Sequence, residues 1–230
     1  MTIWTKISGS ALSLGGSLAS LMDWLKGKGP GPQDPERSVA FTVGVIALGA
    51  KMAKADGVVT EGEIAAFREV FHVDADEIAN VARVFNLAKK DVAGYETYAH
   101  QLAKLFGDQP EVLEDVMDGL FHIAKAEGAV TDSELAYLKS VADIFGLSQR
   151  FRCIKARHIE AGEDDPYVIL DIEPCASDDE VRRHFRRLVK ANHPDRHVAA
   201  GLPPEMVTIA TERLAAINAA WEAVRRERGL

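Results

Sequence analysis

The strongest constraint on the fold is an internal repeat in the middle of the chain. Residues 53–67, AKADGVVTEGEIAAF, align without a gap with residues 124–138, AKAEGAVTDSELAYL, at an offset of 71 positions. Each copy has the pattern of a helix end, a turn and a new helix. Gly57 and Gly128 suit the backbone conformation that ends a helix. The repeat therefore predicts two helix pairs related by pseudo-symmetry.

A capping box begins the second helix of each copy. Thr60 is followed three positions later by Glu63, and Thr131 is followed by Glu134. The threonine hydroxyl can accept from an unpaired backbone N–H, and the glutamate can accept from the threonine N–H. Apolar residues then recur at helical spacing, without convincing alternation of period two. We therefore predict an all-α bundle over residues 35–159, with shorter helices between residues 74 and 106.

The composition restricts the function. The chain has 230 residues, 47% of them hydrophobic, which allows one medium core or one medium and one small core. A net charge of −8 argues against a dedicated nucleic-acid binder. Cys153 and Cys175 form no CxxC pattern, which favours a reducing compartment with neither a zinc site nor a disulfide. We therefore expect no cofactor and no nucleic-acid partner.

A second, smaller helical unit is predicted over residues 165–230. Ser177 is a good N-cap for a helix with an apolar face and a basic face. The apolar face consists of Val181, Phe185, Leu188 and Val189, and the basic face of Arg182, Arg183, Arg186, Arg187 and Lys190. This helix must end by His193, because a residue before proline is disfavoured in the α region. Pro203 and Pro204 can begin a last helix, and the two helices form an antiparallel hairpin joined by a polar loop.

His193 and Asp195 in that loop raise the alternative of a catalytic pair. Side chains so close in sequence rarely converge on one reacting atom. In addition, no nucleophile, oxyanion loop or phosphate-binding glycine motif accompanies them. We therefore predict that the chain is not an enzyme.

The C-terminal segment resembles the J domain of DnaJ-type co-chaperones. The resemblance is carried by D-x-Y-x-x-L from Asp165, V-R-R-x-F-R-R-L from Val181, H-P-D-R from His193 and A-x-x-x-L-x-x-I-N-x-A-W from Ala210. It implies a protein that binds a DnaK-type chaperone and stimulates its ATP hydrolysis. The residues implied in this binding are Arg182, Arg183, Phe185, Arg186, Arg187, Lys190, His193, Pro194, Asp195 and Arg196.

Three positions depart from the J-domain pattern. Phe185 and Trp221 stand where the family usually has tyrosine, and Asp171 replaces the usual glycine after the first short helix. The loop continuation GLPPEM and the position of the segment at the C-terminus are similar to the DjlA subfamily of membrane-associated bacterial co-chaperones.

The repeat region resembles the TerB-like domain, which the DjlA resemblance also implies. We expect it to be an adaptor for clients, partners or membrane-proximal targeting. Some family members bind divalent metal near these turns, so the weaker metal candidates are Asp56, Glu63, Glu127 and Glu134. An EF-hand register would place Met52, Lys54, Ile123 and Lys125 at ligand positions, and these side chains lack the oxygens that calcium needs. Structural capping is the favoured interpretation, and a metal- or tellurite-stress binding protein is the alternative function.

Residues 1–34 form a separate N-terminal segment and linker. One helical stripe is apolar, and it consists of Ile7, Ala11, Leu14, Leu18, Leu21 and Leu25. It fits a helix that docks on the protein body or on a partner helix, and it also fits an interfacial membrane anchor. We expect a cytoplasmic protein. The hypotheses for this segment are homodimerisation and peripheral contact with the cytoplasmic face of the inner membrane.

Overall fold

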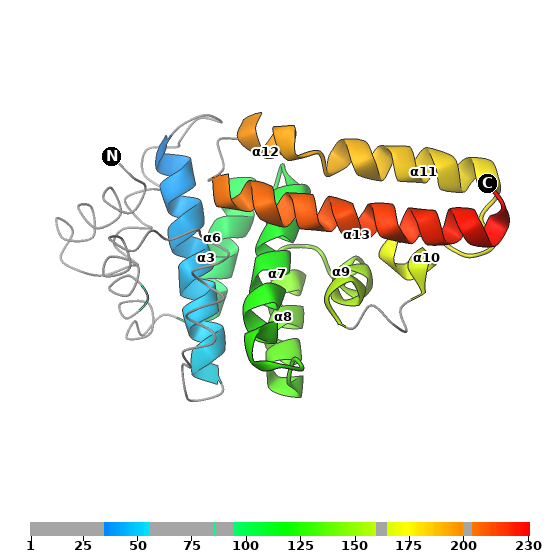
Figure 1. Ribbon diagram of the computed structural model, residues 1–230. Helices are drawn as coiled ribbons and strands as arrows, with labels where there is room; N and C mark the ends of the chain where they lie inside the picture. The colour runs from blue at the N-terminus through cyan, green and yellow to red at the C-terminus, as the bar shows by residue number, and fades with distance from the viewer. Residues whose placement is uncertain (1–34, 56–84, 86–93, 160–164, 200–203) are drawn as a thin grey trace.

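The computed structural model describes residues 35–55, 85, 94–159, 165–199 and 204–230 (Figure 1). All regular elements within these ranges are helices, which confirms the predicted all-α class. In the first unit they are α3 (Pro35–Ala55), α6 (Tyr95–Phe106), α7 (Pro110–Ala124), the short 3₁₀ helix η1 (Lys125–Glu127), α8 (Asp132–Ile144) and α9 (Phe151–His158). In the C-terminal unit they are α10 (Pro166–Ile169), α11 (Asp178–Ala191), α12 (Pro194–Ala199) and α13 (Pro204–Arg228).

The second copy of the repeat has the predicted order of helix end, turn and new helix. Helix η1 ends at Glu127, and its C-cap Gly128 has a φ of 127° and a ψ of −134°; glycine readily adopts this conformation, but it is not the left-handed helical one expected at a helix end. Thr131 then caps α8 by accepting from the Glu134 N–H, while the Glu134 carboxylate accepts from the Thr131 N–H at 2.8 Å. This confirms the second capping box. Gly57, Thr60 and Glu63 of the first copy lie outside the described residues.

Helices α3, α6, α7, α8 and α9 enclose the larger apolar core. Phe41 of α3 meets Phe106 of α6 edge to face, with ring centroids 5.5 Å apart. Tyr137 of α8 donates its hydroxyl to the Leu48 carbonyl at 2.9 Å, so the ring is buried with its polar atom paired. A Cβ at Gly44 would lie 2.8 Å from Leu102 Cδ2, so the close approach of α3 and α6 depends on glycine at this position.

The C-terminal unit has a smaller core between α10, α11 and α13. Its buried members are Tyr167, Leu170, Val181, Leu188, Ile217, Ala220 and Val224. Phe185 of α11 stacks on Trp221 of α13 with centroids 4.6 Å apart and ring planes 8° apart. The two residues that depart from the family's tyrosines therefore pack against each other.

Helix α13 belongs to both cores. It runs alongside α11 and crosses α7 (Figure 1). Ile217, Ala220 and Val224 in its second half pack in the smaller core, whereas Ile209 in its first half joins the larger one. The antiparallel hairpin that the sequence predicted accounts for only the second half of α13, because this helix of 25 residues is longer than the 14 residues of α11.

The linker and the N-terminal stripe predicted for residues 1–34 lie outside the described residues. Among the helices that the structure does describe, none combines the length and hydropathy needed to cross a membrane.

Candidate functional site

The basic helix α11 is fixed at its start by a capping box. Ser177 Oγ accepts from the Glu180 N–H at 3.4 Å, and the Glu180 carboxylate accepts from the Ser177 N–H at 2.8 Å. Asp178, Asp179 and Glu180 occupy the first turn, where negative charge is favourable. The N-cap predicted at Ser177 is therefore confirmed.

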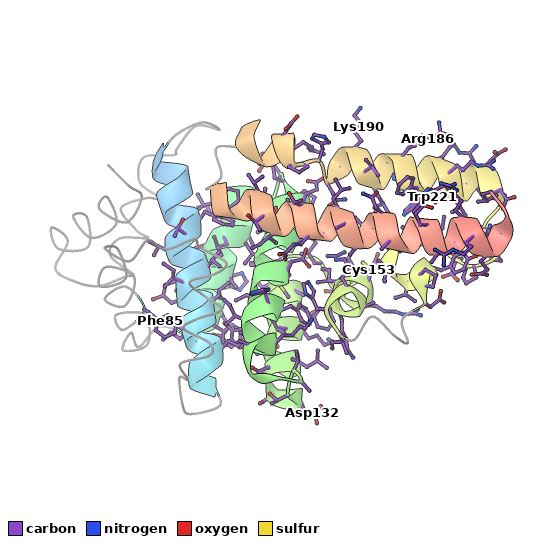
Figure 2. All side chains as sticks on the ribbon, in the orientation of Figure 1. Phe85, Asp132, Cys153, Arg186, Lys190 and Trp221 are labelled. Carbon is purple, nitrogen blue, oxygen red and sulfur yellow. The ribbon has the colours of Figure 1, made fainter. Side chains whose placement is uncertain are left out.

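The two faces of α11 separate as the sequence predicts. Val181 and Leu188 are buried against α10 and α13. Arg183, Arg186, Arg187 and Lys190 are exposed, and Arg182 is partly exposed beside Asp179. Figure 2 shows Lys190 on the side of α11 that faces away from α13, with Arg186 further along the same helix. The basic face is thus open to a partner.

His184, which the sequence analysis did not single out, helps to organise this face. Its Nε2 donates to the Leu170 carbonyl at 2.7 Å, and its Nδ1 accepts from the Arg187 guanidinium at 2.6 Å. Burial lowers the pKa of His184, and the neighbouring Arg187 charge lowers it further. A neutral imidazole therefore links α10 to the basic face.

The His193-Pro194-Asp195 segment lies at the junction of two helices. Helix α11 ends at Ala191, Asn192 is its C-cap, and Pro194 begins α12. The sequence predicted a polar loop here, and the structure instead begins a short helix, because proline is well suited to a first helical position. The side chains of His193 and Asp195 are 52% and 89% exposed, so both are accessible to a partner.

His193 and Asp195 also contact each other. The Asp195 N–H donates to His193 Nδ1 at 3.3 Å, and Nδ1 lies 3.5 Å from Asp195 Oδ2. The His193 imidazole thus lies against the first turn of α12. This arrangement leaves the Asp195 carboxylate in solvent, where a partner's arginine can pair with it.

The two residues that flank the segment are anchored, which the sequence analysis missed. Asn192 is buried; its Nδ2 donates to the Leu188 carbonyl at 2.8 Å, and its Oδ1 accepts from Arg213 Nη1 at 2.9 Å. Arg196 donates to the Ala191 carbonyl at 3.3 Å and lies 3.6 Å from Glu111 of α7. The only sequence signal for these anchors was the presence of polar residues on both sides of the motif. A sequence alone does not identify the partners of such residues.

Arg213 lies in a buried ionic cluster between the two units. It donates to Asp118 Oδ2 at 2.6 Å and pairs with Asp115, both on α7. The other members of the cluster are Glu114 of α7, Arg157 and His158 of α9, and Arg150 just before α9. Burial alone would raise the pKa of the Asp118 carboxyl, but Arg157, Arg213 and His158 hold it well below its usual range.

The metal candidates are only partly within the described residues. Glu134 is buried, and its carboxylate accepts from both the N–H and the hydroxyl of Thr131, so its position is explained by capping. Asp56 and Glu63 lie outside the described ranges, and nothing is described of the Glu127 side chain. Within the part of the chain that the structure describes, no three His, Cys, Asp or Glu side chains gather as a metal site would require.

Both cysteines are free thiols. Cys153 is buried in the larger core, and burial raises its pKa, which keeps the less reactive protonated form. Cys175 is exposed in the smaller unit.

Comparison with known families divides the chain into two consecutive domains. The family described as tellurite resistance protein TerB matches residues 42–158, and the DnaJ domain matches residues 165–228. A helical domain followed by a J domain with an exposed His-Pro-Asp segment is the arrangement of a J-domain co-chaperone. The chain belongs to the TerB family and carries a C-terminal DnaJ domain, as the resemblance to the DjlA subfamily predicted.

Several relatives can be aligned with most of the chain. The co-chaperone protein DjlA of Coxiella burnetii is 28% identical over 200 residues, which cover 78% of this chain and 74% of the relative. DjlA of Photobacterium profundum is 26% identical, with 84% and 80% covered, and DjlA of Vibrio cholerae is 26% identical, with 88% and 83% covered. No solved structure is significantly similar. The J domain and these relatives support a co-chaperone function.

Proposed function

We propose that the protein is a co-chaperone whose J domain binds the ATPase module of a DnaK-type chaperone and stimulates its ATP hydrolysis. The observation that carries this proposal is the exposed Asp195 carboxylate in the first turn of α12, close to the end of helix α11, whose basic face is also exposed. The basic face of α11 attracts an acidic patch over long range and mainly raises the association rate. Asp195 then pairs with an arginine of the chaperone, while His193 and Pro194 maintain the shape of the segment.

The test is the ATPase rate of a DnaK-type chaperone in the presence of the full chain and its Asp195→Asn variant. The variant should fold normally, since a solvent-exposed change costs under about 0.5 kcal/mol. It should lose the stimulation, because the amide cannot form a charged pair with arginine. Asp179→Asn is a matched control, since Asp179 is 80% exposed on the same domain but lies at the other end of α11. Full stimulation by Asp195→Asn would contradict the proposal.

We also propose that the TerB domain, residues 35–159, is an adaptor that recruits clients or partners to the J domain. Its support is the acidic composition of the domain, with 18 acidic against nine basic residues between positions 39 and 148. Such a composition favours basic partners. Binding of a basic client peptide to the full chain should weaken with added salt. Salt-independent binding would contradict an electrostatic adaptor.

For residues 1–34, we propose that the segment associates with the membrane surface or with a second copy of the chain. The support is its apolar stripe, which needs a surface to order against. Deletion of residues 1–28 should remove vesicle binding or dimerisation and leave ATPase stimulation in solution unchanged. Resistance of the membrane-bound full chain to carbonate extraction would show integral insertion and contradict a peripheral association.

A further inference from the structure

The His193-Pro194-Asp195 segment is attached on both sides to a helix of the TerB domain. On its N-terminal side, Asn192 accepts from Arg213, and the same guanidinium donates to Asp118 of α7. On its C-terminal side, Arg196 lies 3.6 Å from the Glu111 carboxylate at the start of α7. The segment itself remains exposed, so these attachments leave it open to a partner.

All three guanidinium nitrogens of Arg213 donate hydrogen bonds. Nε donates to Asp118 Oδ2 at 2.6 Å, Nη2 donates to Asp115, and Nη1 donates to Asn192 Oδ1 at 2.9 Å and to the Glu111 carbonyl at 3.3 Å. The residue is 3% exposed. The rigid planar fork of an arginine can bind several acceptors at fixed angles, which a lysine ammonium cannot do. The guanidinium therefore determines the position of Asn192 relative to α7.

The interface between α13 and the TerB domain around Arg213 combines apolar and ionic contacts. Ile209, one turn before Arg213 on α13, is 5% exposed and packs within the apolar core of the TerB domain. Burial of Asp115 and Asp118 leaves them dependent on Arg213 and Arg157 for charge compensation. Apolar and ionic contacts thus fix the first half of α13 on α7, while its second half remains in the J-domain core.

We propose that Arg213 is a positioning residue. Through it the TerB domain holds the His193-Pro194-Asp195 segment in the conformation that binds the chaperone. This inference rests on the proposed function and assigns to the TerB domain a role beyond recruitment. The acidic residues of α7 hold Arg213, Arg213 holds Asn192, and Asn192 fixes the end of α11 from which the segment continues. The attachment of Arg196 to Glu111 restrains the other end.

Two variants of the full chain test the proposal without emptying the ionic cluster. Asn192→Ala removes the acceptor of Arg213, and Glu111→Gln weakens the contact with Arg196. Asn192→Ala should lower the maximal ATPase stimulation about fivefold, the effect of one hydrogen bond of about 1 kcal/mol. Glu111→Gln should lower it by a smaller factor, because the ion pair of Glu111 with Arg196 is partly exposed at 3.6 Å. The concentration for half-maximal stimulation should change less than about twofold, because the basic face of α11 is intact and sets the encounter.

Matched controls separate positioning from general stability. Asn218→Ala changes an exposed asparagine of the same helix as Arg213, and Asp132→Asn removes a carboxylate at the far end of the TerB domain (Figure 2). Both should keep wild-type stimulation. Arg213→Lys should retain the charge and the fold but lose the positioning, since its ammonium cannot bind Asn192 and both aspartates together. Lowered stimulation in the two controls, or full stimulation by Asn192→Ala and Glu111→Gln, would overturn the proposal.

Hydrogen–deuterium exchange gives a readout that needs no chaperone. Peptides that span residues 189–199 should exchange faster in Asn192→Ala and Glu111→Gln than in wild type, while peptides from α8 should be unchanged. If wild type fails to stimulate any DnaK-type ATPase, the proposed function is wrong, and exchange alone then decides whether the segment is held. Unchanged exchange in both variants would overturn the positioning role.

Discussion

Arg213 Nη1 donates to Asn192 Oδ1 at 2.9 Å, so the last helix of the J domain binds the residue that directly precedes His193. The same side chain donates to Asp118 of the TerB domain at 2.6 Å. One guanidinium therefore connects the junction of α11 and α12 with the neighbouring domain. The contribution of this connection to the free energy of unfolding can be measured by substituting its few buried residues.

Arg213→Met should destabilise the protein strongly. The variant leaves Asp115 and Asp118 buried without their main compensating charge, and loss of one partner of a buried ion pair costs about 3–5 kcal/mol. Urea unfolding monitored by circular dichroism measures the loss. Arg225→Met is the control, since Arg225 pairs with Glu222 on the exposed surface of the same helix and should lose under about 1 kcal/mol. Equal losses in the two variants would contradict the importance of the buried cluster.

Acid should weaken the ionic cluster through Asp118. Its pKa is lower in the folded chain than in the unfolded chain, where it is about 3.9. The ionised carboxylate therefore contributes stability above about pH 4, and this contribution is lost as the pH falls toward the folded pKa. A cavity of about 200 Å³ lies beside the cluster, and its lining includes Asp118, Arg157 and Arg213.

Asp118→Asn should accordingly lose less of its free energy of unfolding than wild type between about pH 5 and pH 3. At neutral pH the variant starts from a lower stability, because the amide does not compensate Arg157 and Arg213. Urea unfolding at a series of pH values gives the slope of the free energy of unfolding against pH for the variant and for wild type. Asp179→Asn should follow the wild-type slope, and an Asp118→Asn slope as steep as wild type would show that other groups dominate acid unfolding.

Thr131→Ala should cost about 1 kcal/mol, as removal of an N-cap usually does. The variant loses the hydroxyl that accepts from the Glu134 N–H and donates to the Glu134 carboxylate at 2.8 Å. Ser140→Ala on the same helix is the control and should be nearly neutral, because Ser140 only bonds back to the Ala136 carbonyl. A micromolar affinity for calcium or zinc that Glu134→Gln abolishes, measured by calorimetry, would instead support the metal alternative.

The local elements were predictable because their signals are local. The capping box at Thr131, the N-cap at Ser177 and the stop before Pro194 each depend on residues within a few positions, and all three occur where expected. Arg213 was not predictable as an anchor. Its partners Asp118 and Asn192 lie 95 and 21 positions away, and spacing within a helix does not indicate contacts between domains. For the same reason the sequence did not show that Ile209 packs in the larger core.

Asp171→Gly should stabilise the J domain by about 0.5–1 kcal/mol. Asp171 follows α10 with a φ of 53°, the only positive φ of a non-glycine residue among the described positions. This conformation costs an L-residue about 1–2 kcal/mol, and glycine adopts it without that cost. The gain is reduced because glycine also increases the entropy of the unfolded chain. Thermal unfolding measures the change. Asp171→Ala should be less stable than Asp171→Gly, and the reverse order would show that the aspartate side chain outweighs its backbone strain.

Charge reversal on the basic face should slow association with the chaperone. Arg186→Glu combined with Arg187→Glu replaces two exposed cations of α11. The screening length is about 8 Å at physiological ionic strength, so long-range attraction depends on salt. In stopped-flow or surface-binding kinetics, the association rate should fall and its salt dependence should weaken, while the dissociation rate changes less.

The control for this experiment makes the same change in net charge elsewhere. Arg225→Glu combined with Arg226→Glu alters two exposed arginines near the C-terminal end of α13, on a different helix from Arg186 and Lys190. This variant should associate nearly as fast as wild type, because the orientation of charge and not its total directs the encounter. If both double variants slow association equally, overall charge explains the effect. If wild-type association is independent of salt, the basic face does not steer binding, and recognition would then depend on the contacts of Asp195 alone.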